Sequence, residues 1–138
     1  MADPFNLQKF VDAQAPVYQQ ARREMAAGRK ESHWMWFIFP QIAGLGQSPM
    51  SIRFAIASLD EAKAYLAHPV LGPRLRECAE LTLGVEGKSA RDVFGGIDEM
   101  KFRSSMTLFA RAALDDVFQL CIDKYFAGSP DPATLAKV

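Results

Sequence analysis

The sequence has no excess of charge of either sign, since its 138 residues include 16 Lys and Arg side chains and 16 Asp and Glu side chains. Balanced charge creates no overall field that would recruit nucleic acid or an anionic membrane surface, which argues against both partners. The N-terminal residues lack the basic segment and apolar core of a signal peptide, and no apolar run reaches the roughly 18 to 20 residues of a membrane span. We therefore expect a cytoplasmic protein that does not enter a membrane.

Cysteine and histidine are equally scarce. Cys78 and Cys121 are too far apart in sequence for a C-x-x-C redox motif, and too few for a tetrahedral zinc site. The two imidazoles, His33 and His68, would need a third ligand that no spacing supplies. We expect neither a metal nor a cofactor, and we expect the cysteines to be buried free thiols.

The composition is that of a globular protein, because 49% of the residues are hydrophobic and 23% are charged. The length suits one domain, and no repeat, low-complexity tract or linker divides the chain. We therefore predict a single domain spanning residues 1–138.

Helical signals dominate the pattern, so the predicted fold class is mainly α, a single compact helical domain. Ser58 and Glu61 form a capping box, Gly28 follows an amphipathic stripe as a helix stop, and Asp98 precedes a stripe of Phe102, Met106 and Phe109. Asp3 and Pro4 likewise begin a helical pattern. Helices are expected over residues 3–14, 17–27, 58–67, 69–82, 89–94, 98–109 and 115–125, followed by a short polar tail.

Residues 33–46 (HWMWFIFPQIAGLG) contain both tryptophans of the chain and bracket a large apolar anchor with polar groups and glycines. Residues 34–39 are apolar on every face, and their aromatic content favours extended chain. Residues 41–49 have the composition of a loop, and residues 51–57 alternate weakly. We therefore expect a short extended segment or a small sheet around residues 34–57.

Three blocks in this order resemble a known family: residues 33–41 (HWMWFIFPQ), 64–72 (AYLAHPVLG) and 98–109 (DEMKFRSSMTLF). The sequence is similar over nearly its whole length to a small bacterial domain-of-unknown-function family that genome annotation often labels calpastatin-like. The resemblance implies a stand-alone, mostly helical cytosolic protein and carries no settled activity. The calpastatin label finds no support, because a calpain inhibitor would be disordered and charge-rich.

The helix that starts at Asp98 carries the strongest candidate site. Lys101 and Ser105 share one face of this helix, with Ser104 beside them. A lysine and two small hydroxyl groups near a helix N-terminus suit a phosphate or carboxylate. The alternative is a solvated lysine, with serines that pack closely against another helix.

Other residues are weaker candidates. Gly44 and Gly46 would aim backbone N–H groups at an anion or simply form a turn. His33 would serve as a general acid or base, because imidazole titrates near neutral pH, or as a hydrogen-bonded structural residue. The basic cluster of Arg22, Arg23, Arg29 and Lys30 is expected to be a solvated helix face, with contact to a phosphate-bearing ligand as the alternative.

Our first functional hypothesis is a protein with a pocket for a small, anionic, nucleotide-like or sugar-phosphate-like ligand. Trp34 and Trp36 would stack on the ligand, and Gln41, Gly44, Gly46, Lys101, Ser104 and Ser105 would bind it. Hydrolysis is one conceivable reaction, such as an N-glycosidase that uses His33 and Asp98.

The alternative is a non-enzymatic interaction module that docks through residues 34–39, and a homo-oligomer also stays open. The two hypotheses differ in whether the tryptophans line a concavity or a flat exposed patch. Under the pocket hypothesis, packing of residues 34–39 against the stripe of Phe102 brings Lys101 and Ser105 to one cleft with Gln41 or His33.

Overall fold

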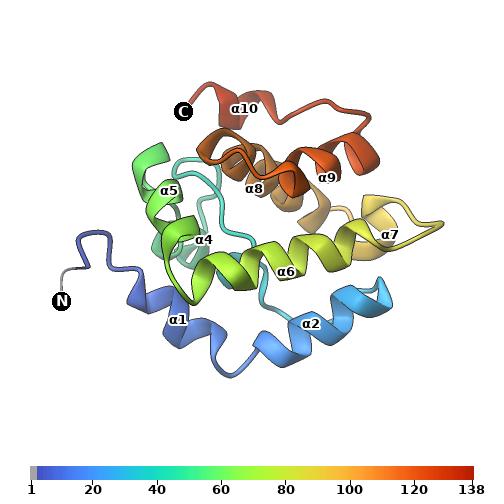
Figure 1. Cartoon of the computed structure of the whole chain (residues 1–138), viewed down its shortest axis with the longest axis horizontal. Helices are drawn as coiled ribbons and strands as arrows, with labels where there is room; N and C mark the ends of the chain where they lie inside the picture. Colours follow the sequence, from blue (N-terminus) through green and yellow to red (C-terminus); the bar gives the residue numbers. More distant parts are fainter. Residues whose placement is uncertain (1–2) are drawn as a thin grey trace.

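Helices supply the secondary structure of the computed structural model, which describes residues 3–138 (Figure 1). Apart from one isolated bridge, no strand or sheet occurs in this part of the chain. The ten helices of these residues are α1 (Gln8–Gln14), α2 (Tyr18–Ala27), α3 (Met35–Ile38), α4 (Pro49–Arg53), α5 (Leu59–Ala67), α6 (Leu71–Leu83), α7 (Ala90–Phe94), α8 (Asp98–Ala112), α9 (Asp116–Phe126) and α10 (Pro132–Leu135).

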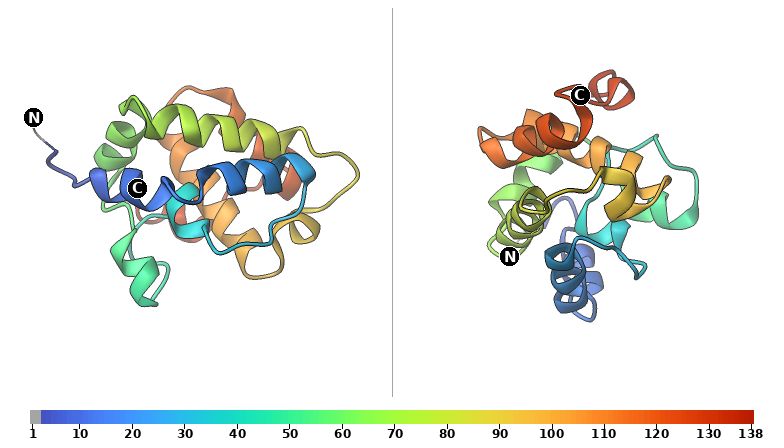
Figure 2. Two further views of the ribbon diagram at one scale, coloured as in Figure 1. Left: turned by 90° about the horizontal axis from the view of Figure 1, so that it is seen from below. Right: turned by 90° about the vertical axis from the view of Figure 1, so that its right-hand side faces the viewer.

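The helix α6 divides the molecule into two sides. Helices α1 and α2 lie on one side of it and α8, α9 and α10 on the other, as both the face view and the end view show (Figures 1 and 2). Helix α8 packs against α5, α7, α9 and α10, and α6 packs against α2, α5 and α9. The buried apolar side chains, which range in sequence from Leu7 to Ile122, belong to one hydrophobic core, so the helices form a single compact domain.

The helix signals in the sequence have the expected physical basis. Gly28 ends α2 in the left-handed conformation, with φ of 72°. The Ser58 hydroxyl accepts a hydrogen bond from the Glu61 backbone N–H at 3.1 Å. The Glu61 carboxylate accepts from the Ala57 N–H at 3.0 Å and not from the Ser58 N–H, so only half of the predicted capping box forms. Phe102, Met106 and Phe109 are fully buried. No helix among the described residues is long and apolar enough to cross a membrane.

The expected extended segments around residues 34–57 are wrong. Residues 34–39 contain α3, a single helical turn that Pro40 does not allow to continue. Pro49 starts α4 at the first helical position, and the Ser48 hydroxyl caps this helix. A parallel bridge between Ile42 and Ile56 is what forms there in place of a sheet.

Both ends of the chain differ from the prediction. Asp3 accepts hydrogen bonds from the Leu7 and Gln8 backbone N–H groups, so its side chain caps a helix that begins later than expected. At the other end the expected polar tail contains α10. Asp131 caps this helix and accepts a hydrogen bond from the Ser104 hydroxyl at 3.0 Å, which fastens α10 to α8.

Candidate functional site

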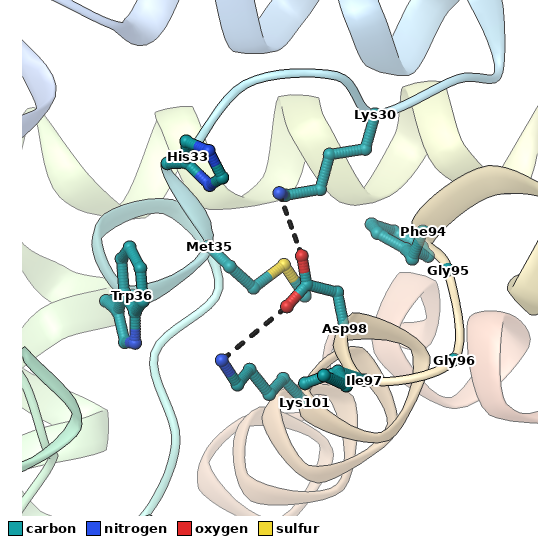
Figure 3. A pocket seen from close by; sticks show the side chains of 10 residues that line it. All are labelled: Lys30, His33, Met35, Trp36, Phe94, Gly95, Gly96, Ile97, Asp98 and Lys101. Atoms are coloured by element: carbon teal, nitrogen blue, oxygen red, sulfur yellow. Dashed lines mark ion pairs between the residues drawn. The ribbon is translucent and has the colours of Figure 1, made fainter. Parts of the chain in front are cut away.

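A cavity of about 400 Å³ lies between the segment of residues 30–36 and the start of α8 (Figure 3). One wall comes from the loop after α2 and from α3, and the other from the turn between α7 and α8. The cavity is lined by Lys30, His33, Met35, Trp36, Phe94, Gly95, Gly96, Ile97, Asp98 and Lys101.

Asp98 stands between two lysines in this cavity. Its Oδ2 lies 2.8 Å from the Lys30 Nζ and its Oδ1 lies 3.6 Å from the Lys101 Nζ (Figure 3). The Lys30 side chain is only 7% exposed, and the other two are mostly buried. Two ammonium groups on one carboxylate leave one unit of positive charge beside the cavity. The shorter pair holds Lys30 in place, whereas Lys101 is beyond hydrogen-bond distance and has donors to offer.

Each lysine also lies over a tryptophan ring. The Lys101 Nζ is 5.0 Å from the Trp36 ring centroid, and the Lys30 Nζ is 5.1 Å from that of Trp34. At these distances the negative face of the ring attracts the ammonium group. Asp98 and the two rings therefore hold both cations at the cavity wall.

Glu24 of α2 positions the segment that carries Lys30 and His33. Its carboxylate accepts hydrogen bonds from the Glu31 and Ser32 backbone N–H groups, the Ser32 hydroxyl and the Trp34 indole N–H. Burial alone would raise the pKa of Glu24, but these hydrogen bonds outweigh it and lower the pKa to about 2. The segment is thus tied to α2 by an ionised carboxylate.

A second tie joins this segment to α7. The Lys30 backbone N–H donates to the Val93 carbonyl at 2.8 Å. Gly95 then takes φ of 85°, which turns the chain into α8. The hydrogen bond and the turn thus link the wall that carries Lys30 to the wall at the start of α8.

Four of the predicted site residues lie together in the cavity. His33 is exposed at the rim, Trp36 is half-buried, and Asp98 and Lys101 lie deeper. Asp98 does not cap α8 as expected, because it is the first helical residue and its carboxylate turns to the lysines. His33 and Lys101 thus share one cleft although they are far apart in sequence.

Gln41 lines a small neighbouring cavity of about 10 Å³, together with Ser51, Trp36 and Lys101. A space of this size holds about one water molecule. The Trp36 indole N–H is buried and has no acceptor among the described residues. Gln41 therefore meets Lys101 beside the main cavity and does not line it.

The other predicted tryptophan and both serines lie outside the cavity. Trp34 is fully buried, with its indole N–H on Glu24. Ser104 donates to Asp131 and belongs to the attachment of α10. Ser105 is fully buried on the core side of α8, so it does not join Lys101 in the predicted cleft.

The two predicted loop glycines do not line the cavity either. A Cβ atom at Gly44 would lie 2.9 Å from the Lys137 Nζ, and one at Gly46 would lie 2.5 Å from the Ser51 Cβ. Gly44 has φ of 97°, which favours glycine. The loop needs these glycines for its turns and close contacts.

Sequence reasoning missed Lys30, which it assigned to a solvated face with three arginines. That assignment is wrong for Lys30, because the chain reverses at Gly28 and carries the lysine inward to Asp98. The helix stop was a visible signal that residues beyond it leave the α2 surface. Within residues 3–138, no group of three or more His, Cys, Asp or Glu side chains is arranged to hold a metal ion.

The comparisons with known proteins place the chain in a family. The model of the family described as "Protein of unknown function (DUF1810)" matches residues 4–138, which agrees with the predicted family of unknown function and says nothing of calpastatin. The chain is 52% identical to the conserved hypothetical protein Rv1873 from Mycobacterium tuberculosis. Its crystal structure gives a TM-score of 0.96, with 97% of this chain and 96% of that chain covered. No curated protein matches.

Proposed function

The chain belongs to the DUF1810 family, and we propose that it binds a small anionic molecule in the cavity between residues 30–36 and the start of α8. The observation that carries the proposal is the pair of lysines on a single carboxylate at the cavity wall. Mostly buried ammonium groups are costly unless their charge is compensated, and Asp98 compensates only one of them. An incoming anion would supply the second negative charge.

Lys101 is the residue that would contact the anion. Its ammonium group is 3.6 Å from Asp98 and lies over Trp36, so its donors remain available at the cavity surface. The half-buried Trp36 ring would pack against the body of the ligand. A volume of about 400 Å³ is within the usual range for small-molecule sites. Nucleotides and sugar phosphates are the ligand classes that the sequence favoured.

Catalysis has less support than binding. An N-glycosidase would need a carboxyl group that exchanges a proton or attacks the substrate. Both oxygens of Asp98 instead face lysine ammonium groups, which favours a fixed carboxylate that orients cations. His33, at the rim, is the residue that would exchange a proton if a reaction occurs there.

The interaction-module alternative also has less support. It requires the aromatic segment to form an exposed patch, yet Trp34, Met35, Ile38 and Phe39 are buried. Trp36 lines a concavity next to Lys101. A tryptophan in a concavity is what the pocket hypothesis requires, whereas the interaction module requires a flat exposed patch.

A thermal-shift and tryptophan-fluorescence screen would test the proposal, using nucleotides, ADP-ribose, sugar phosphates and carboxylates. A ligand at about 100 times its Kd stabilises the fold by about 2.7 kcal/mol, which gives a clear rise in Tm. Lys101→Met should abolish the rise while changing stability by less than about 1 kcal/mol. Lys63→Met is the matched control, because Lys63 is exposed on α5 away from the cavity.

Two outcomes would contradict the proposal. No response to any anion in the screen would remove the binding function. An equal response of the wild type and the Lys101→Met variant would place binding elsewhere on the protein.

A further inference from the structure

The chemistry of the cavity wall narrows the class of ligand. Apart from its charged groups, the rim histidine and the indole N–H of Trp36, the lining side chains are apolar: they belong to Met35, Trp36, Phe94 and Ile97. No hydroxyl or amide side chain occurs among the lining residues. Each buried hydroxyl group of a ligand needs a hydrogen-bond partner, so a polyol body fits this wall poorly.

The exposed end of the wall is also apolar. Ile97 is 77% exposed, although it lines the cavity, and Met100 one turn later is 66% exposed. An exposed isoleucine at a cavity mouth gains when an apolar ligand body covers it. Figure 3 shows Ile97 beside the base of the Lys101 side chain, whose ammonium group reaches toward Trp36. The cationic end and the apolar wall therefore face one ligand together.

The charge of the cluster sets the charge of the ligand. Lys30 and Lys101 carry two positive charges and Asp98 carries one negative charge, which leaves one positive charge to be matched. A carboxylate carries one negative charge, whereas a phosphate monoester carries about 1.5 to 2 at neutral pH. A monoanion matches the cluster, and a dianion brings excess charge into a partly dehydrated site.

These features narrow the ligand class further than the small anionic molecule of the proposed function, on which this inference rests. We infer that the cavity takes a monocarboxylate with an aromatic, hydroxyl-poor body. The carboxylate would accept from the Lys101 ammonium group, and the ring would lie between Trp36 and Ile97. Sugar phosphates, which have a polar body and two charges, fit this site least.

Four probes separate the effect of the polarity of the ligand body from the effect of the ligand charge. They are phenylacetate, phenyl phosphate, gluconate and ribose 5-phosphate. Their Kd values would be measured by NMR titration at about pH 8, where imidazole side chains are mostly neutral. Phenylacetate should bind tightest, about tenfold tighter than gluconate. It should also bind tighter than phenyl phosphate, and ribose 5-phosphate should bind weakest.

The variants Ile97→Ser and Met100→Ser supply a matched pair. Ile97 directly precedes α8, Met100 lies in its first turn, both are exposed, and only Ile97 lines the cavity. Ile97→Ser should weaken phenylacetate binding about fivefold and leave gluconate binding unchanged. Met100→Ser should change neither. Equal effects of the two substitutions would contradict the placement of the ring.

The remaining outcomes separate this inference from the function on which it rests. Tighter binding of gluconate or of either phosphate than of phenylacetate would overturn the ligand class and leave anion binding intact. Binding of nucleotides without binding of phenylacetate would do the same. Silence of all four probes and of the wider screen would overturn both.

Discussion

Two carboxylates, Glu24 and Asp98, flank the segment of residues 30–36, and they differ in the groups that contact them. Glu24 accepts from neutral donors of the segment itself: two backbone N–H groups, a hydroxyl and an indole N–H. Asp98 faces two lysine ammonium groups and has no such set of neutral donors. Glu24 lies inside the fold, whereas Asp98 lines a cavity.

The difference distinguishes a carboxylate that stabilises the fold from one that lines the proposed binding cavity. Neutral donors around Glu24 use up its acceptor capacity, so this carboxylate has nothing to offer a ligand and serves the fold alone. The cluster of Asp98 keeps a surplus positive charge at a surface that solutes reach. The same short segment thus carries a structural face and a face toward the proposed binding cavity, with Trp34 on the first and Trp36 on the second.

The largest effect should come from Glu24→Gln. The new amide places N–H groups opposite donors that the carboxylate had satisfied, so we expect the free energy of unfolding to fall by about 3 kcal/mol. Urea denaturation at neutral pH measures this loss. A change below about 1 kcal/mol would mean that the network around Glu24 is dispensable.

Acid should remove the stabilisation that the ionised Glu24 carboxylate gives to the wild type. The folded state lowers the pKa of Glu24 from 4.5 to about 2. A lowered pKa gives stability that is fully present above about pH 4.5 and is lost as the pH falls through 2, up to about 3 kcal/mol in all. The stability difference between the wild type and Glu24→Gln should therefore shrink from pH 5 to pH 2. A constant difference would contradict this assignment.

The two tryptophans should respond unequally to the same change. Trp34→Phe removes the indole donor to Glu24 in the fully buried core and should cost about 2 kcal/mol. Trp36→Phe should cost less than about 1 kcal/mol, because this ring is half-buried beside the cavity. Thermal unfolding of both variants tests the contrast, and equal losses would erase the distinction between the two faces of the segment.

Asp98→Asn should have the most distinctive effect on binding. The amide still accepts a hydrogen bond from Lys30, but it no longer compensates the charge of this buried ammonium group, so we expect a loss of about 2 kcal/mol. The site gains one unit of positive charge, and anions should bind several-fold tighter, with dianions gaining most. Calorimetric titration with phenyl phosphate and phenylacetate measures this gain. Weaker anion binding would show that Asp98 itself contacts the ligand.

Local signals explain which parts of the fold could be predicted. The helix stop at Gly28, the cap at Ser58 and the stripe of Phe102 act within a few residues, so sequence alone located α2, α5 and α8. Residues 34–39 defeated the same reasoning, because a segment buried on every face has no periodicity. The conformation of these residues, a single helical turn, depends on the core that packs around them and on Pro40.

The candidate site was only partly visible for a related reason. The sequence singled out Asp98 and Lys101 from their position at the start of a long helix, and both line the cavity. Ser105 shares that helix but faces the core. The buried face of α8 is wider than the predicted stripe of Phe102, Met106 and Phe109, and it includes Ser105. Lys30 joins the site through a pairing across 68 residues of sequence, which no local pattern reveals.

The bridge between Ile42 and Ile56 has a further consequence for the chain between them. The Ala43 N–H donates to the Ile56 carbonyl and the Ile56 N–H to the Gln41 carbonyl, each at 2.8 Å, so both ends of this loop are pinned together. Doubling the length of a loop with fixed ends costs only about 0.6 kcal/mol. Helix α4, which stands off the main body in Figure 2, is therefore the place where this protein should accept an inserted peptide and keep its fold.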